Sequence, residues 1–216
     1  MTKIKICGIT NCEDAKNAVD LGADFLGFNF YDKSPRFVDY KKVKDIVNEL
    51  NGNVGIVGVF VNETIDNIKK ISDYSNLDLI QLSGDEDLQY IRKLKNSIKR
   101  KTIKAFHIKS NKINNLINSF KSDYIMLDSC KKGVYGGTGM SFDLNLANGI
   151  SNRRLFLAGG LNDTNVMAAI EKINPFAVDV CSSIESGPRK KNYYKMKRFI
   201  EAVRVIKLVK NNEMVR

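Results

Sequence analysis

The chain alternates short apolar runs with longer segments of helical periodicity, and this regularity constrains its fold more than any other feature. Eight apolar runs are nearly continuous in Val, Ile, Leu and Phe, as expected of parallel strands buried on both faces. A segment with apolar residues at helical spacing follows each run. The predicted strands are residues 3–6, 24–30, 54–60, 77–82, 102–107, 124–127, 154–157 and 177–180, and the predicted helices are residues 11–21, 40–50, 62–74, 85–97, 112–120, 143–147, 162–173 and 192–209.

This order of elements predicts an α/β protein in which residues 1–216 form one single-domain (β/α)8 TIM barrel. The main rival is a doubly wound open sheet, which binds nucleotides through a G-x-G-x-x-G turn after its first strand. Here the corresponding turn, residues 7–10, reads C-G-I-T, and the chain contains no Walker lysine motif. We therefore expect the barrel, with no nucleotide cofactor.

The lengths of the apolar runs and the spacing of the cysteines indicate where the protein is expected in the cell and whether it binds a metal. The longest apolar runs, such as residues 56–61, are far too short for a membrane helix, and the N-terminus shows no signal-peptide pattern. Cys7, Cys12, Cys130 and Cys181 form no C-x-x-C pair, which fits neither a disulfide framework nor a zinc site. We expect a cytoplasmic protein with reduced thiols, no membrane partner and no metal.

Lys and Arg number 35 against 24 Asp and Glu, a formal net charge of +11. Such a balance raises the possibility of a nucleic-acid partner. However, the lysines are spread along the predicted helices and mixed with acidic residues, a pattern typical of solvated faces, and a biased genome composition would produce the same enrichment. We expect no nucleic-acid partner as the main function, and a positive field that favours an anionic small molecule.

Glycines and serines gather after the last three predicted strands. Close approach of backbone N–H groups to a phosphate requires positions without a Cβ atom, and the loops after strands 7 and 8 are the usual phosphate site of this fold. Each glycine alone also has a simpler interpretation as a turn former. The pattern predicts a phosphorylated small-molecule substrate, with candidate contacts from Gly137, Gly159, Gly160, Cys181, Ser182 and Ser183.

Cys7 and Asp128 are the candidates for acid–base chemistry, because each follows a predicted strand at the end of the barrel that carries active sites. Cys7 is open to three interpretations: packing group, nucleophile or general base. A protease-like nucleophile needs a histidine partner, and the one histidine, His107, lies in no recognisable motif. Asp128 follows an apolar strand, where desolvation raises a carboxyl pKa; it is either an acid or a cap for the next turn.

Three further polar residues are candidates for binding. The planar fork of Arg36 suits a substrate carboxylate, although a surface ion pair is the alternative. Gln81 lies at the carboxyl end of the fourth predicted strand and is expected to line the pocket. Asp179 is expected to orient backbone or phosphate-site groups.

Taken together, these segments resemble the phosphoribosylanthranilate isomerase family of tryptophan biosynthesis. The resemblance covers nearly the whole chain, and its motifs occur in family order. They are K-I-C-G-I-T at residues 5–10, G-F-N-F-Y-x-x-S-P-R at 27–36, V-G-V-F-V-N at 57–62, Q-L-S-G-D-E at 81–86, L-D and G-G-T-G within 127–139, A-G-G-L-N at 158–162, and V-D-V-C-S-S-I-E-S at 178–186.

The resemblance implies a cofactor-free Amadori rearrangement of N-(5-phosphoribosyl)anthranilate, carried out by a monomer or homodimer. It implies that Asp128 is the general acid that protonates the ring oxygen and that Cys7 is the base that removes the C2 proton. Arg36 would hold the anthranilate carboxylate. The loops with Gly159–Gly160 and residues 181–183 would hold the phosphate.

Three positions depart from the family pattern. Ser83 stands where the family usually has histidine, Ser183 where it has glycine, and Arg189 lies in a changed Pro-Gly-x-Lys-Asp segment. Two alternatives therefore stay open. One is a related sugar-phosphate isomerase barrel with another substrate, and the other is a non-catalytic barrel that binds phosphorylated ligands or RNA.

Overall fold

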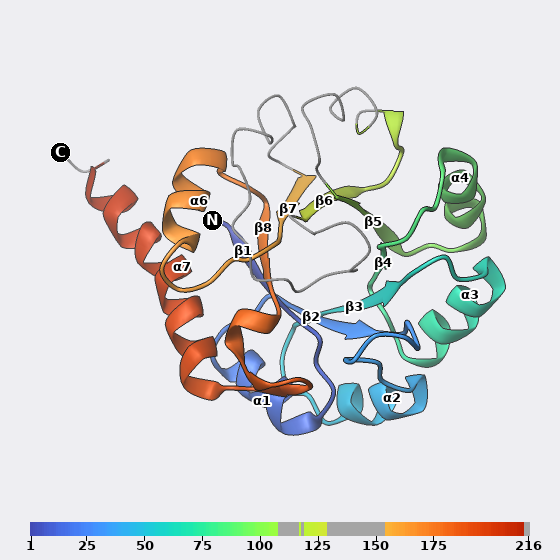
Figure 1. The fold of residues 1–216 in the computed structure, drawn as a ribbon, viewed down its shortest axis with the longest axis horizontal. Coiled ribbons are helices and arrows are strands. Elements are labelled where there is room, and N and C mark those ends of the chain that lie inside the picture. The colour runs from blue at the N-terminus through green and yellow to red at the C-terminus, as the bar shows by residue number, and fades with distance from the viewer. Residues whose placement is uncertain (108–116, 118, 129–153, 214–216) are drawn as a thin grey trace.

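The computed structural model describes residues 1–107, 117, 119–128 and 154–213. In this part of the chain, eight parallel strands follow one another around a closed barrel, and β1 pairs with both β2 and β8 (Figure 1). The predicted (β/α)8 barrel is confirmed. Its strands are β1 (Lys3–Cys7), β2 (Phe25–Asn29), β3 (Gly55–Phe60), β4 (Leu79–Leu82), β5 (Lys101–His107), β6 (Tyr124–Asp128), β7 (Leu155–Leu157) and β8 (Ala177–Val180).

Helices surround the strands (Figure 1). Several begin at the side-chain caps that their sequences favour: Asn11, Asp39, Thr64 and Asp87 each accept a hydrogen bond from a backbone N–H in the first turn. The predicted helices 112–120 and 143–147 fall largely outside the described residues. The described helices are α1 (Cys12–Asp20), α2 (Tyr40–Asn48), α3 (Ile65–Tyr74), α4 (Leu88–Ser97), α6 (Val166–Ile173) and α7 (Tyr193–Glu213).

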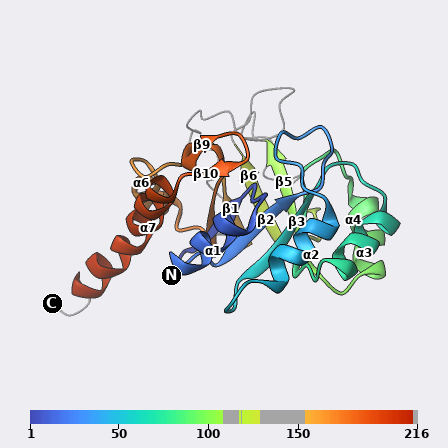
Figure 2. The same cartoon turned by 90° about the horizontal axis from the view of Figure 1, so that it is seen from below.

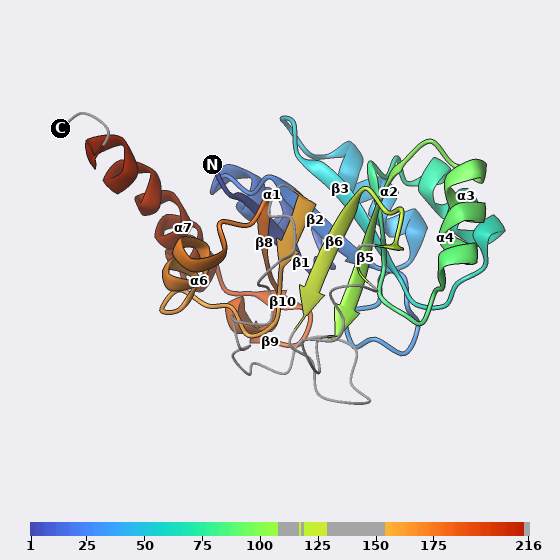
Figure 3. The same cartoon turned by 90° about the horizontal axis from the view of Figure 1, so that it is seen from above.

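The segment between β8 and α7 has structure that the sequence did not predict. A short 3-10 helix, η3 (Ser182–Ile184), is followed by two strands, β9 (Glu185–Gly187) and β10 (Lys190–Lys191), which pair antiparallel. Figures 2 and 3 show β9 and β10 at one end of the barrel, and the arrowheads of β5 and β6 in Figure 3 point to that end. This segment therefore borders the carboxyl ends of the barrel strands.

Alternate residues of each strand divide the apolar core in two. One set packs between the sheet and the helices, and the other fills the barrel interior. Inside, aromatic rings gather near the amino ends of the strands, where Tyr124 stacks on Phe176 with ring centroids 4.9 Å apart and Phe156 packs edge-on against Tyr124. The amino end is thus closed by apolar packing, and inward-facing polar residues are left to the carboxyl end.

The last helix, α7, packs its amino-terminal part against the barrel through the buried side chains of Met196, Phe199, Ile200 and Val203. Its carboxyl-terminal part projects beyond the barrel (Figures 1 and 3). None of the described helices has the length and apolar character needed to cross a membrane.

Candidate active site

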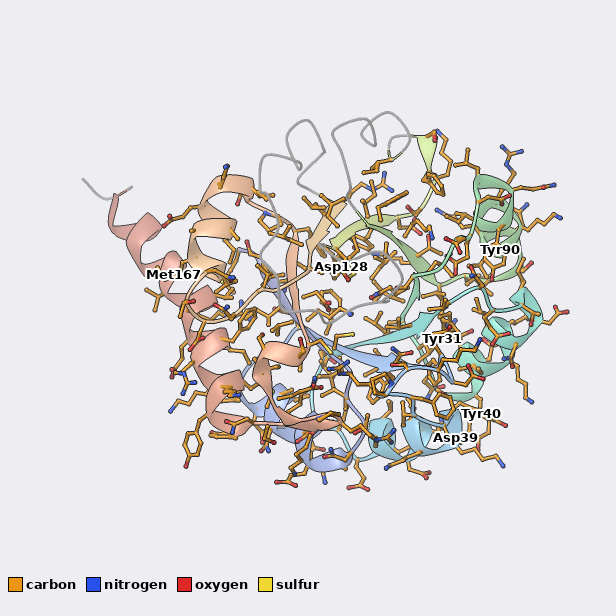
Figure 4. All side chains as sticks on the ribbon, viewed as in Figure 1. Tyr31, Asp39, Tyr40, Tyr90, Asp128 and Met167 are labelled. Atoms are coloured by element: carbon orange, nitrogen blue, oxygen red, sulfur yellow. The ribbon has the colours of Figure 1, made fainter. Side chains whose placement is uncertain are left out.

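A cavity of about 400 Å³ opens at the carboxyl ends of the barrel strands. Gly137 lies outside the described residues, so the structure says nothing of its position. Figure 4 shows Asp128 close to the centre of the ring of strands, whereas Tyr40 and Tyr90 lie at its outer rim. The other ten predicted site residues all line the cavity: Cys7, Arg36, Gln81, Asp128, Gly159, Gly160, Asp179, Cys181, Ser182 and Ser183.

Cys7 shares the inner face of β1 with Lys5, two residues earlier in the strand. The Lys5 ammonium is fully buried and lies 2.6 Å from a carboxylate oxygen of Asp179. A Cβ atom on Gly27 would stand 2.8 Å from the Cys7 sulfur and 3.0 Å from the Lys5 nitrogen. Because glycine leaves that space open, the thiol and the ammonium lie next to each other.

Burial and charge act in opposite directions on this lysine and its carboxylate. Burial raises the pKa of Asp179 to about 7, and Lys5 only partly offsets it. Burial by itself lowers the pKa of Lys5, but the negative charge of Asp179 and of a Cys7 thiolate outweighs it and raises the pKa overall. Lys5 is therefore a fixed positive charge beside the thiol, and burial keeps the pKa of Asp179 above the usual carboxyl range.

Cys7 and Cys181 both line the cavity, at the carboxyl ends of two neighbouring strands. They meet because Ile6 of β1 lies opposite Val180 of β8, which makes the next residues of both strands neighbours. The hydrogen bond with Cys181, together with burial, raises the pKa of Cys7. The same bond, with the charges of Lys191 and Arg36, lowers the pKa of Cys181 to about 6 against the effect of burial. Of the two thiols, Cys181 is therefore the one whose surroundings favour the thiolate.

Arg36, in the loop after β2, forms a forked ion pair with Glu185 of β9: Nε donates to Oε1 at 2.8 Å and Nη2 donates to Oε2 at 2.6 Å. Lys191 of β10 donates to the same carboxylate at 3.0 Å. Burial raises the pKa of Glu185, but these two cations lower it overall. With two cations and one carboxylate, the group carries a net positive charge at the cavity wall.

Gly8 makes this arrangement possible. Its φ of +74° lies in the left-handed region, which glycine adopts without strain. A Cβ atom here would stand 2.6 Å from Cδ of Arg36 and 2.9 Å from the sulfur of Cys181. The glycine therefore allows the arginine to lie over the second thiol.

Asp128 ends β6, on the same strand face as the buried Met126. The backbone of Asp128 lies opposite His107 in the register of β5 and β6. Met126 and Ala158 line the cavity beside it and give this wall an apolar character. Cys7 and Asp128 thus come from β1 and β6, which are not neighbours in the barrel, and both border the same space.

The loops after β7 and β8 contain the residues predicted to bind a phosphate, and these residues line the cavity. Gly159 and Gly160 have φ values of 89° and 67°, which disfavour residues with side chains. The first N–H groups of η3, beginning at Ser182, have no partner within so short a helix. The Ser183 hydroxyl donates to the Leu161 carbonyl at 2.5 Å and joins the two loops. The extra side chain at position 183 is therefore directed to the backbone.

Gln81 is 5% exposed, and its amide nitrogen donates to the Ser83 hydroxyl at 3.0 Å. Its carbonyl oxygen is buried and has no hydrogen-bond partner among the described residues. Buried acceptors are rarely left unpaired. This oxygen therefore provides a position in the cavity wall for a donor group.

Lys5, Glu185 and Lys191 belong to the site but were not singled out from the sequence. Lys5 carried a usable pattern, since a lysine two residues before Cys7 lies on the same face of a buried strand. Glu185 and Lys191 carried none, because the contact of Glu185 with Arg36 joins residues 149 positions apart. In the described part of the chain, no group of three or more His, Cys, Asp and Glu side chains could hold a metal ion.

Comparison with known proteins gives a consistent result. The sequence profile of the family "N-(5'phosphoribosyl)anthranilate (PRA) isomerase" matches residues 4–202. An N-(5'-phosphoribosyl)anthranilate isomerase from Trichlorobacter lovleyi is 42% identical over 202 residues, covering 93% of this chain and 97% of the relative.

Solved structures agree. Phosphoribosyl anthranilate isomerase from Thermotoga maritima superposes with a TM-score of 0.85 at 37% identity, covering 95% of this chain and 100% of that one. A second structure, at a TM-score of 0.82, 37% identity and the same coverage, is a complex of such an isomerase with reduced 1-(o-carboxyphenylamino)-1-deoxyribulose 5-phosphate.

Proposed function

The chain belongs to the N-(5'-phosphoribosyl)anthranilate isomerase family, and we propose that it performs the family's reaction with Asp128 as general acid and Cys7 as general base. The reaction is an isomerisation in tryptophan biosynthesis, in which the aldose N-(5'-phosphoribosyl)anthranilate becomes 1-(2-carboxyphenylamino)-1-deoxyribulose 5-phosphate. The observation that carries the assignment of roles is that a carboxyl group and a thiol from non-neighbouring strands border one cavity.

Asp128 supplies the first proton. The furanose ring opens when its oxygen is protonated and the nitrogen lone pair forms a C1=N bond, which gives a Schiff base. The apolar side chains of Met126 and Ala158 line the cavity together with Asp128. A neutral acid at this wall is the form that the ring-opening step requires.

Cys7 removes the proton from C2 of the Schiff base and leaves an enolamine, which tautomerises to the ketone. A thiolate in so buried a place needs a nearby positive charge. Lys5 supplies it, since the Lys5 ammonium and the Cys7 sulfur lie on either side of the space left by Gly27. The acid and the base thus act on opposite sides of the substrate.

Two positively polarised walls bind the two anionic ends of the substrate. Arg36 uses two of its N–H groups on Glu185, and the fork has five, so donors remain for the anthranilate carboxylate. The phosphate lies against the backbone of the loops that contain Gly159, Gly160, Ser182 and Ser183, where positive φ values and the start of η3 favour N–H donors. We further propose a cytoplasmic enzyme that is a monomer or homodimer.

The test is an isomerase assay on the purified full-length chain, with Asp128→Asn and Cys7→Ser as variants. We expect turnover by the wild type in the presence of a metal chelator, and a loss of about 10²- to 10⁴-fold in kcat for each variant, with an unchanged melting temperature. Cys12→Ser is the matched control, because Cys12 lies on α1 and contacts Glu49 outside the cavity.

Complementation of a tryptophan auxotroph that lacks this isomerase tests the same proposal in cells. Growth is expected from the wild-type chain and from Cys12→Ser. Full turnover by both Asp128→Asn and Cys7→Ser would refute the acid–base assignment.

A further inference from the structure

Two thiols at the β1–β8 junction meet in one cavity, although the base role uses only one of them. Cys7 and Cys181 are both free cysteines, both line the cavity, and each follows one of the paired residues Ile6 and Val180. Cys12, the third free cysteine described, lies on α1 beside Glu49. Two of the three described thiols therefore lie in the cavity wall, and the proposed base step gives a function to Cys7 alone.

The charges around the pair are arranged unequally. Lys191 of β10 is 1% exposed at its side chain, and its ammonium lies 3.7 Å from the Cys181 sulfur and 3.1 Å from the Cys181 carbonyl oxygen. Arg36 approaches the same sulfur over Gly8. Glu185 of β9 accepts hydrogen bonds from both cations and partly neutralises their charge. Two cations against one carboxylate therefore face Cys181.

Cys7 faces a different set of charges. Its nearest cation is Lys5 of β1, which is already bound to Asp179 of β8 at 2.6 Å. Negative charge is therefore better supported on the sulfur of Cys181 than on that of Cys7, in line with the lowering of the Cys181 pKa to about 6 and the raising of the Cys7 pKa. The surrounding charges thus favour a thiolate at Cys181 over one at Cys7 in the resting pair.

We propose that Cys181 is a positioning residue for the base: its thiolate takes the S–H proton of Cys7 as Cys7 takes the proton from C2 of the substrate. This inference rests on the role of Cys7 in the proposed function. The C2–H bond breaks, its electron pair forms the C1=C2 bond of the enolamine, and the C1=N bond becomes single. The thiol pair holds one proton before the step and two after it. It returns the second to C1 while the C2 hydroxyl gives its proton to the Asp128 carboxylate, which forms the C2 carbonyl and restores the acid.

This role differs from phosphate binding, which the sequence suggested for residue 181. A phosphate contact acts on binding, so its loss would raise KM and weaken inhibition by inorganic phosphate. A thiolate that accepts the proton of Cys7 acts on the protonation state of the base, so its loss would move the acidic limb of the pH–rate profile. KM and inhibition by inorganic phosphate therefore report on phosphate binding, and the pH–rate profile reports on proton transfer from Cys7.

The test compares Cys181→Ser with the wild type and with Cys12→Ser in pH profiles of kcat and kcat/KM. For the wild type we expect the acidic limb near pH 6. For Cys181→Ser we expect a limb near the ordinary thiol pKa of about 8.5, a loss of about tenfold or more at pH 7, recovery at pH 9 and an unchanged KM. Cys12→Ser is expected to follow the wild-type profile.

A second measurement needs no turnover: titration of the thiolate ultraviolet absorbance in the wild type, Cys7→Ser and Cys181→Ser. We expect one thiolate per cavity to form near pH 6 in the wild type and near pH 8 or above in Cys181→Ser. Lys191→Met should move the transition upward and Lys191→Arg should restore most of it.

An acidic limb that stays in place in Cys181→Ser, or a raised KM with an unchanged profile, would overturn the inference while leaving the proposed function intact. A wild-type chain with no isomerase activity would instead defeat the proposed function, and the absorbance titration would still report on the pair.

Discussion

Two buried lysine–carboxylate pairs in this barrel have nearly the same geometry and very different surroundings. Lys5 and Asp179 lie 2.6 Å apart, and Lys104 and Glu86 lie 2.7 Å apart, with every side chain at most 10% exposed. Lys5 points into the barrel below the cavity. Lys104 points out of it, since its strand neighbour Ala105 belongs to the interior cluster.

The second pair is saturated with hydrogen bonds. Glu86 accepts from the backbone N–H of Asn62 at 2.8 Å and from that of Gly84 at 3.0 Å, besides Lys104. Lys104 also donates to the Gly84 carbonyl at 2.7 Å. This pair fastens the loops after β3 and β4 to β5, and neither residue is among the described residues that line the cavity.

The first pair is left incomplete. Among the described residues, Asp179 accepts a hydrogen bond from Lys5 alone, and both groups lie next to Cys7. Burial of an ion pair costs free energy that only further hydrogen bonds recover. A buried lysine–carboxylate pair thus holds loops in place when it is fully hydrogen-bonded, and leaves its charges beside a cavity thiol when it is partly bonded.

The largest expected effect on stability is at the saturated pair. Glu86→Gln leaves the Lys104 ammonium buried without its carboxylate, so we expect the free energy of unfolding to fall by about 3–5 kcal/mol. The folded fraction should keep its kcat. Chemical denaturation measures the loss, and Glu86→Leu/Lys104→Met is the control, because removal of both charges should cost less. A loss below 1 kcal/mol for the single variant would contradict the comparison.

Lys5→Met should cost less stability and more activity. Asp179 already has a pKa of about 7 and can take up a proton, so we expect a loss of about 1–3 kcal/mol. The folded variant binds that proton more tightly than the unfolded chain does, so its stability falls as pH rises toward the folded pKa. Loss of the cation beside Cys7 should lower kcat/KM about tenfold at pH 7.

Chemical denaturation of Lys5→Met at pH 6 and pH 8 measures how its free energy of unfolding changes with pH. If the loss of unfolding free energy relative to the wild type is the same at both pH values, Asp179 stays ionised without its lysine. Full kcat/KM would show that Lys5 has no influence on Cys7.

A third buried lysine, Lys191, forms an ion pair with the buried Glu185 at 3.0 Å. The pKa of its partner Glu185 is lowered, so the pair stabilises the fold above the ordinary carboxyl pKa and that stability is lost as pH falls through the folded pKa. Glu185→Gln should remove about 1–2 kcal/mol at pH 7 and less at pH 3.5. It should also raise KM, because Arg36 loses its forked partner. Melting curves of Glu185→Gln and the wild type at pH 7 and pH 3.5 check this pH dependence. An equal loss of stability at the two pH values would contradict it.

The smallest stability effect is expected at Gln81, whose buried carbonyl oxygen lacks a partner among the described residues. Replacement by Leu removes an unpaired polar group, so Gln81→Leu should change stability by less than about 1 kcal/mol. KM should rise if the substrate supplies the missing donor. An unchanged KM would show that this oxygen takes no part in binding.

Much of the fold could be predicted because local patterns encode it. Apolar runs such as residues 54–60 match β3 (Gly55–Phe60), and Thr64 caps α3 as its sequence favours. Departures arise where tertiary contacts decide: β9, η3 and β10 lie in a segment predicted as a loop, and α7 runs to Glu213 instead of 209. A two-residue strand such as β10 has too little sequence to show a period.

Most of the candidate site could also be predicted, because parallel strands in a barrel bring their carboxyl ends together. That rule selected Cys7, Asp128 and Asp179 from their places after apolar runs. The sequence alone determined the barrel, the family resemblance and these chemical groups. Only the tertiary structure decided which groups meet: the Cys7–Cys181 pair, the Lys5 ammonium beside it and the Arg36–Glu185–Lys191 group. The physical reason is that charge and proton sharing depend on distances of a few ångströms between residues far apart in the chain, and no local period records those distances.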